Sequence, residues 1–156
     1  MMTQLCQELN NWFDRGQEKF FGTITIHEDG TMTCNNSSFS DSPITPLEGQ
    51  FFRIVGSALN DGAHQYPDTS MLQETFEDGA VWLMAVPPTV RKLAEKIQAW
   101  RDKYESVDSA AMSPFNSESY SVYSYSKGSG SSGKSGYNPS SWQSVFSNQL
   151  NAWRKV

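Results

Sequence analysis

PTVRKLAEKIQAWRDKY, residues 88–104, is the most regular stretch of the sequence, and the predicted architecture starts from it. Its apolar residues recur every three or four positions, which places them on one face of an α-helix, and charged residues fill the opposite face. Proline is tolerated in a first turn, where its missing N–H would have no partner. A long amphipathic helix is therefore predicted over residues 88–104. Its apolar face comprises Val90, Leu93, Ala94, Ile97, Trp100 and Tyr104.

A hairpin is predicted near the start of a β-rich region that covers residues 22–66. β-Branched residues are frequent at positions 22–27 and 31–34, and the turn residues Glu28-Asp29-Gly30 lie between them. The next residues, 35–45, are rich in Ser, Asn, Asp and Pro. That composition favours an irregular loop over a regular element.

A second hairpin is predicted where the apolar run at residues 51–55 is followed by Asn60-Asp61-Gly62, with residues 63–66 as the return strand. A further apolar run at residues 80–86 is too short to cross a membrane and too apolar for a surface. It is therefore predicted to be buried. Periodicity leaves open whether this run is a strand or a helix.

The two ends of the chain are also predicted to be helical. Residues 3–14 carry apolar side chains at helical spacing, and Gly16 follows in the place of a C-terminal cap. Residues 140–156 carry Ser141 as a candidate N-cap, followed by a stripe of apolar side chains. Together with the β-rich region and the long helix, the first of these helices completes a predicted core domain over residues 1–105.

The composition changes beyond the core domain. Residues 106–126 become rich in Ser and Tyr and are predicted as an extended arm, because Tyr and Val favour strands. Residues 127–139 have the composition of a flexible Gly/Ser linker. The amphipathic helix predicted at residues 140–156 then has two possible docking sites, its own domain or a neighbouring subunit, and the sequence leaves both open.

Composition narrows the classes of function. The 156 residues carry a formal net charge of -5, with no cluster of Lys and Arg that would grip a phosphate backbone. Cys6 and Cys34 are far apart and form no CxxC pair, so reduced thiols are predicted, with a single disulfide as the alternative. No signal peptide or membrane-spanning run is recognised, so a chain made in the cytoplasm with no membrane contact is expected.

No motif gives positive support for catalysis, a cofactor or a metal. Residues 128–135, GSGSSGKS, match the spacing of a phosphate-binding loop, but no apolar strand precedes them and Pro139 follows closely. The match is interpreted as an accident of composition. His27 and His64 lie outside metal-ligand spacing of each other and of a cysteine. The prediction is therefore a non-enzymatic protein with no catalytic, cofactor-binding or metal-binding residues.

A resemblance to a known protein family gives a more specific expectation, and it rests on the order of several short sequence segments. The chain resembles head-tail connector proteins encoded by prophages of Gram-positive bacteria over roughly residues 49–156. The phrases that carry the likeness are Gly49 to Gly62, Phe76 to Trp82 with Val86-Pro87-Pro88, Ile97 to Trp100, Ser117 to Tyr120, and Trp142 to Phe146 with Leu150 to Lys155.

The resemblance implies a structural subunit of the virion neck. Such an adaptor forms a dodecameric ring beneath the portal protein, joins the DNA-filled head to the tail, and lets the genome pass. Its implied partners are the portal, neighbouring copies of itself, a stopper or tail-terminator protein, and DNA in transient contact. The expected fold class is α+β, with a helical adaptor core, a small inserted β subdomain and an extended C-terminal arm that ends in a short helix.

The arm and the terminal helix are the predicted interface with the portal or a neighbouring subunit. Tryptophan offers a large contact area at a small cost in entropy, which favours an interface role for the tryptophans beyond the linker. Trp82 and Trp100 are instead predicted to lie in the core. The predicted interface residues are Tyr120, Val122, Tyr123, Tyr125, Trp142, Phe146, Leu150 and Trp153.

Three alternatives stay open at this point. The same particle also needs head-completion stoppers and tail-completion proteins, which the resemblance does not separate from an adaptor. A host-surface or carbohydrate-binding module would use the strands and exposed tyrosines. A small hydrolase would need a concave cluster around His27 or His64.

Overall fold

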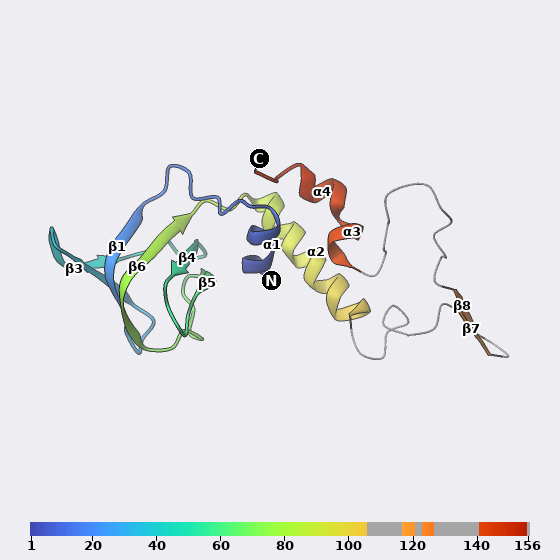
Figure 1. Cartoon of the computed structure of the whole chain (residues 1–156), viewed down its shortest axis with the longest axis horizontal. Helices are drawn as coiled ribbons and strands as arrows, with labels where there is room; N and C mark the ends of the chain where they lie inside the picture. Colours follow the sequence, from blue (N-terminus) through green and yellow to red (C-terminus); the bar gives the residue numbers. More distant parts are fainter. Residues whose placement is uncertain (106–116, 121–122, 127–140, 156) are drawn as a thin grey trace. The chain divides into compact units, whose positions relative to one another are not determined.

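The computed structural model describes residues 1–105, 117–120, 123–126 and 141–155 (Figure 1). The chain divides into two compact units, and the boundary falls between Arg91 and Lys92. The first unit contains residues 1–91 and the end of the chain from Lys155, and the second contains residues 92–154.

The first unit is built on a six-stranded antiparallel sheet with the strand order β3-β2-β1-β6-β4-β5 (Figure 1). Both predicted hairpins are part of it, since Ile26 pairs with Met32 in the first and Phe51 pairs with Gln65 in the second. The strands are β1 (Lys19–Ile26), β2 (Met32–Asn36), β3 (Phe39–Ile44), β4 (Phe51–Val55), β5 (Gly62–Gln65) and β6 (Glu74–Met84).

The prediction of a helical core with a small β insertion is wrong. The eleven-residue strand β6 pairs with β1 on one side and with β4 on the other, so it joins the two hairpins into one sheet. Most of the apolar run at residues 80–86, for which periodicity did not separate strand from helix, forms the last part of this strand, which ends at Met84. Among the described residues α2 (Pro88–Tyr104) is the only helix longer than seven residues, so the fold is dominated by its sheet.

The core lies on one face of the sheet, because successive side chains of a strand point to opposite faces. In β4, for example, Phe52 and Ile54 are fully buried, whereas Arg53 points to the other face and is only partly buried. Met71, from the connection between β5 and β6, joins the same cluster. The cluster comprises Ile24, Ile26, Met32, Cys34, Ile44, Phe52, Ile54, Met71, Phe76, Val81 and Leu83.

The prediction of an irregular loop at residues 35–45 is also wrong, because most of this segment forms β3. β3 lies at the edge of the sheet and pairs only with β2. An edge strand tolerates proline, whose missing N–H removes no bond when that side faces away from the neighbouring strand. Pro43 therefore sits in β3 although the composition indicates a loop.

The first helix, α1 (Met2–Glu8), ends earlier than the predicted helix over residues 3–14. Asn10 takes the left-handed conformation with φ 48°, which is the position after a helix cap that Gly or Asn favours. The Asn10 N–H donates to the Gln7 carbonyl oxygen at 3.0 Å, and the Asn11 N–H donates to that of Cys6 at 3.0 Å. These two bonds form a Schellman motif, in which Asn10 takes the left-handed position predicted for Gly16.

The second unit contains most of α2 and the C-terminal helices. Val90, Leu93, Ala94 and Ile97 of α2 are buried, and the ring of Trp100 lies tilted against that of Tyr104, with a centroid distance of 5.3 Å, at the end of the helix. The C-terminal residues form α3 (Trp142–Val145) and α4 (Ser147–Asn151), where the sequence predicts one helix. The described parts of the arm are β7 (Ser117–Tyr120) and β8 (Tyr123–Ser126), which pair antiparallel. None of the described helices is long and apolar enough to cross a bilayer.

Candidate functional site

The predicted interface residues fall into three groups. Trp142 and Leu150 are buried, with exposed fractions of 6% and 1%, whereas Phe146 and Trp153 are half-buried. Tyr120 lies in β7, and Tyr123 and Tyr125 lie in β8. Val122 lies outside the described residues.

The C-terminal segment, residues 141–155, depends on buried side chains for its order. Helices of four and five residues are not stable in isolation, because nucleation costs more than so few hydrogen bonds return. Ser141 caps α3 by accepting a hydrogen bond from the Ser144 N–H at 3.3 Å. Burial of the large side chains of Trp142 and Leu150 stabilises the segment by roughly 1.5–3 kcal/mol each.

Phe146 separates the two helices and remains available for contact. It is the residue after α3 and the residue before α4, and its side chain makes no cap bond to α4. Next to it Val145 is 36% exposed. The C-terminal segment thus carries a half-buried aromatic ring between its two buried residues, Trp142 and Leu150.

Both edges of the six-stranded sheet are blocked against the addition of another strand. At one edge, β3 contains Pro43, and Asp41 has a φ of 46°. At the other edge, the outward Ala63 N–H of β5 donates to the Thr3 hydroxyl of α1 at 3.0 Å. Proline, local kinks and covering elements are the usual protections of an edge strand. The addition of a further strand is therefore disfavoured at both edges.

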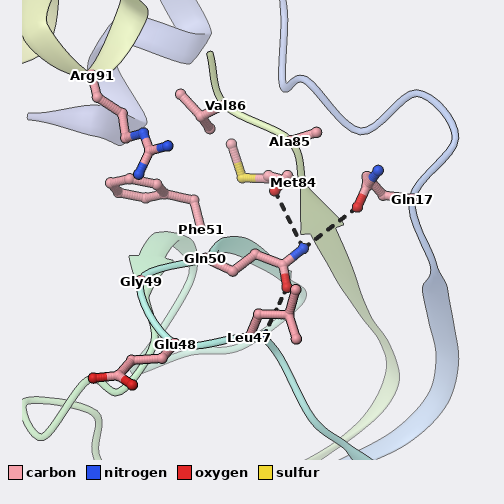
Figure 2. A pocket seen from close by; sticks show the side chains of 10 residues that line it. All are labelled: Gln17, Leu47, Glu48, Gly49, Gln50, Phe51, Met84, Ala85, Val86 and Arg91. Atoms are coloured by element: carbon pink, nitrogen blue, oxygen red, sulfur yellow. Dashed lines mark hydrogen bonds between the residues drawn. The ribbon is translucent and has the colours of Figure 1, made fainter. Parts of the chain in front are cut away.

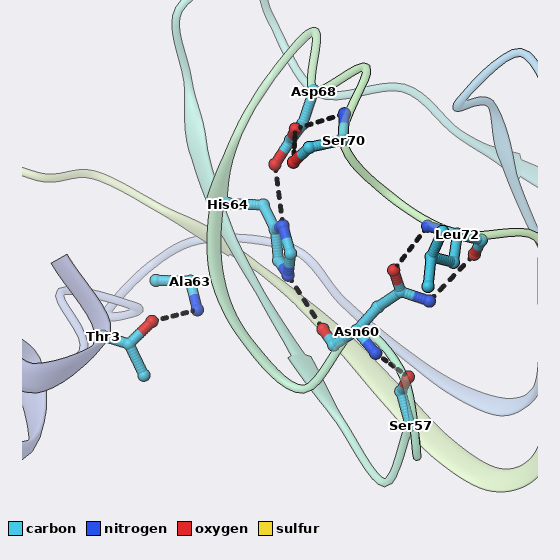
Figure 3. A network of polar contacts seen from close by, with 8 residues as sticks. All are labelled: Thr3, Ser57, Asn60, Ala63, His64, Asp68, Ser70 and Leu72. Atoms are coloured by element: carbon cyan, nitrogen blue, oxygen red, sulfur yellow. Dashed lines mark hydrogen bonds and ion pairs between the residues drawn. The ribbon is translucent and has the colours of Figure 1, made fainter. Parts of the chain in front are cut away.

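His64, one of the two candidate catalytic histidines, is held in a network of polar contacts (Figure 3). Its Nδ1 lies 2.8 Å from a carboxylate oxygen of Asp68, and its Nε2 lies 2.8 Å from the Asn60 carbonyl oxygen. The ring also stacks on Phe52 with a centroid distance of 5.6 Å. Both ring nitrogens are thus engaged within the fold, which counts against a hydrolase site at His64. His27 contacts the Thr33 hydroxyl at 3.4 Å.

Glu74 extends this network and ties the β4–β5 connection to the start of β6. Its carboxylate accepts hydrogen bonds from the Ser57 hydroxyl, from the Ala58 N–H at 3.0 Å and from the Asn60 side-chain amide at 3.1 Å. The Asn60 amide also bonds both backbone groups of Leu72, at 2.8 and 2.9 Å. These bonds, led by that from Ser57, hold the pKa of Glu74 below its ordinary value of 4.5.

The network predicts a pH dependence of stability. A carboxyl with a depressed folded-state pKa contributes stability above its unfolded pKa, and this contribution is lost as the pH falls through the folded pKa. Urea unfolding is therefore expected to show a loss of stability as the pH falls below 4.5. Glu74→Gln should lower the free energy of unfolding by roughly 1 kcal/mol at pH 7, because Glu74 is only partly shielded from solvent. In this variant the free energy of unfolding should also fall less steeply as the pH decreases.

Glu77→Gln is the matched control for Glu74→Gln, because Glu77 is an exposed carboxylate of the same strand. It should keep the pH profile of the unsubstituted protein. If both variants lose the same stability as the pH falls below 4.5, the Glu74 network does not control the pH dependence of stability.

A row of cationic and aromatic side chains crosses the other face of the sheet. Lys19 of β1 and Arg53 of β4 pair across their strands with Trp82 of β6. The Arg53 guanidinium carbon lies 3.7 Å from the ring centroid of Trp12 and 4.9 Å from that of Trp82. The Lys19 ammonium lies 4.7 Å from the Trp82 centroid and pairs with Asp14 at 2.5 Å.

This cation–aromatic row stabilises the fold. It holds Trp12 and Asp14, which follow α1, on the face of the sheet, and each cation–ring contact contributes about 0.5–2 kcal/mol. The Lys19 ammonium lowers the pKa of Asp14 by hydrogen bonding to it. Arg53 lies over the ring of Trp12, and Lys19 and Arg53 both lie over the ring of Trp82, so the faces that these cations cover are not free to stack on a sugar. The row therefore gives no support to the carbohydrate-binding alternative.

Both cysteines are buried and free, as predicted. Burial raises the pKa of Cys6 to about 12 and also raises that of Cys34. Because the thiolate is the nucleophile and the metal ligand, such thiols are unreactive at neutral pH. Among the described residues no group of three or more His, Cys, Asp or Glu side chains is arranged to hold a metal ion.

One pocket of the first unit combines apolar walls with a charged group (Figure 2). Its volume is about 240 Å³. It lies where the end of β6 meets the start of α2, and it could not be predicted from the sequence because its walls come from four separate segments. The lining residues are Gln17, Leu47, Glu48, Gly49, Gln50, Phe51, Met84, Ala85, Val86 and Arg91.

Comparisons of the chain with protein-family models, with curated proteins and with solved structures find no match. The likeness to head-tail connectors therefore rests on the sequence phrases alone.

Proposed function

We propose that this protein is a structural subunit of the neck of a tailed bacteriophage, where it joins the DNA-filled head to the tail and lets the genome pass. The observation that carries the proposal is the C-terminal segment. It lies beyond a Gly/Ser-rich stretch and anchors itself through Trp142 and Leu150, while Phe146 is only half-buried. Aromatic residues of this kind are frequent hot spots of protein interfaces.

The remainder of the described chain supports an assembly role over a catalytic one. Its candidate chemical groups are engaged in holding the fold, as His64 and Glu74 show, and its thiols have raised pKa values. Its sheet edges are blocked by Pro43 and by Thr3. Contacts with a portal or with neighbouring copies would then use side-chain surfaces, and heterologous contacts generate a ring when the rotation between neighbouring copies closes.

A neck subunit of this design does not require a helical core. A rigid sheet unit and a separate contact segment are sufficient, and the net charge of -5 disfavours tight binding of the passing DNA. We place the subunit in the ring beneath the portal, with the head-completion stopper and the tail-completion protein as the other positions in the same neck.

Size-exclusion chromatography with light scattering tests this proposal. The full chain should co-elute with purified portal protein of the same particle, at a mass that corresponds to several copies per portal ring. The proposal would be overturned if the chain stays monomeric, binds neither the portal nor the tail-side neck proteins, and binds glycans.

A further inference from the structure

We propose that the pocket at the start of α2 binds a carboxylate attached to an apolar group. This inference goes beyond the neck proposal and does not depend on it. It rests on the composition of the walls, on the hydrogen bonds that the wall residues already make, and on the position of Arg91.

The size and the walls of the pocket fit a ligand the size of one side chain. At about 240 Å³ it is smaller than the roughly 300–1,000 Å³ of pockets for drug-sized molecules. Leu47, Phe51, Met84 and Val86 supply apolar surface to its walls (Figure 2). An apolar ligand body is therefore accommodated by these walls.

The amide of Gln50 has little remaining capacity for a ligand. Its oxygen accepts the Leu47 N–H at 2.8 Å. Its nitrogen donates to the Gln17 side-chain oxygen and to the Met84 carbonyl oxygen, both at 3.4 Å. Gln50 therefore shapes the wall and leaves the recognition of a charged ligand to another residue.

Arg91 is that residue. Its Nε is buried and has no hydrogen-bond partner in the described part of the chain, where Arg91 also forms no ion pair. In Figure 2 its guanidinium group points toward Phe51, and the Glu48 carboxylate points away from it. A desolvated donor without a partner is costly, and a carboxylate is the ligand that a guanidinium binds best.

The position of Arg91 in the first turn of α2 strengthens the preference for an anion. The positive end of a helix dipole lies at its N-terminus, and α2 has no acidic residue in its first turn to balance it. The helix and the guanidinium thus favour the same charge at one place. The shared ligand chemistry is a carboxylate on an apolar body, whether a free small acid or a Glu side chain beside an apolar residue in a partner protein.

Titration of the ¹⁵N-labelled full chain by NMR tests the inference with four probes. The probes are hexanoate, its neutral counterpart hexanamide, the capped peptide Leu-Glu-Leu and the capped peptide Leu-Gln-Leu. Saturable shifts of the amides of residues 47–51 and 84–91 are expected with hexanoate or with Leu-Glu-Leu. The tighter of these two binders identifies the source, and the neutral counterpart of each should bind at least about tenfold more weakly.

Arg91→Gln should weaken the binding of the carboxylate probe by at least about tenfold. Lys92→Gln is the matched control, since it removes the same charge from an exposed neighbour in α2, and it should bind like the unsubstituted chain. The amide spectra of both variants report whether the fold is kept. Absence of saturable shifts at millimolar probe, equal affinity for acid and amide, or full binding by Arg91→Gln would overturn the inference.

Discussion

Replacing Gly22 with alanine is expected to lower the free energy of unfolding by about 3 kcal/mol or more. Gly22 has a φ of 144°, a conformation that a residue with a side chain rarely adopts. A Cβ there would lie 2.3 Å from the Asn35 carbonyl oxygen, which belongs to the backbone of β2 and cannot rotate away. Backbone strain of about 1–2 kcal/mol and overpacking of about 1–3 kcal/mol add at this position.

Gly16→Ala separates the two contributions. Gly16 also has a positive φ, 75°, but nothing lies within 4 Å of the place where its Cβ would be. Alanine there should cost only the backbone strain, about 1 kcal/mol. Urea unfolding of both variants, followed by circular dichroism, gives the comparison, and equal losses would show that β1 and β2 do not pack as closely as described.

The Gly22 variant also examines the strand pairing on which the fold depends. Gly22 of β1 lies opposite Gly79 of β6, beside an irregularity in the register of the two strands. A Cβ on Gly79 would lie 2.3 Å from the ring of Phe76. Two glycines are therefore needed where the central strands cross this irregularity, and neither is replaceable without movement of a neighbour.

The parts of the fold that could be predicted from the sequence are those with local causes. The turn residues before Thr31 and before Ala63 predict both hairpins, and the apolar stripe of residues 88–104 predicts α2. Ser141 is recognisable as a cap from its position before Trp142. In each case the deciding residues lie within one turn or one helix of each other.

The architecture of the sheet could not be predicted in this way, because it depends on pairing between distant segments. The run at residues 80–86 is apolar throughout, so neither the period of a strand nor that of a helix is visible in it. Its identity as a strand follows from partners in β1 and β4. The helical core that the family likeness implies is wrong, because β1 and β4 both pair with β6 in one sheet.

Among the candidate sites, too, only features with a local cause could be predicted from the sequence. An interface role for Trp142 and Phe146 is predicted from their position beyond the Gly/Ser-rich stretch. The contact of Arg53 with Trp12 and the placement of Arg91 beside Phe51 were not, because each joins residues far apart in the chain. Trp82 was predicted to lie in the core, whereas it is half-buried on the opposite face of the sheet.

Phe146→Asp is expected to weaken binding to the portal by roughly 30-fold, because a hot-spot aromatic contributes about 2 kcal/mol or more to an interface. The substitution should leave the C-terminal segment folded. Phe146 is the N-cap residue of α4 and makes no side-chain cap bond, and Asp is among the favoured residues at that position. Loss of binding would then report the missing ring and not a lost helix.

Gln149→Asp is the matched control for Phe146→Asp. Gln149 is exposed, and it lies in the first turn of α4, where an acidic residue is favourable. The two variants introduce the same charge into the same short segment. They differ in whether an aromatic contact is removed.

Negative-stain imaging of purified portal rings mixed with the full chain, with Phe146→Asp and with Gln149→Asp tests most directly whether the C-terminal segment makes the neck contact. The account predicts decorated rings with the full chain and with Gln149→Asp, and bare rings with Phe146→Asp. Rings decorated equally by all three proteins, or bare with all three, would contradict it.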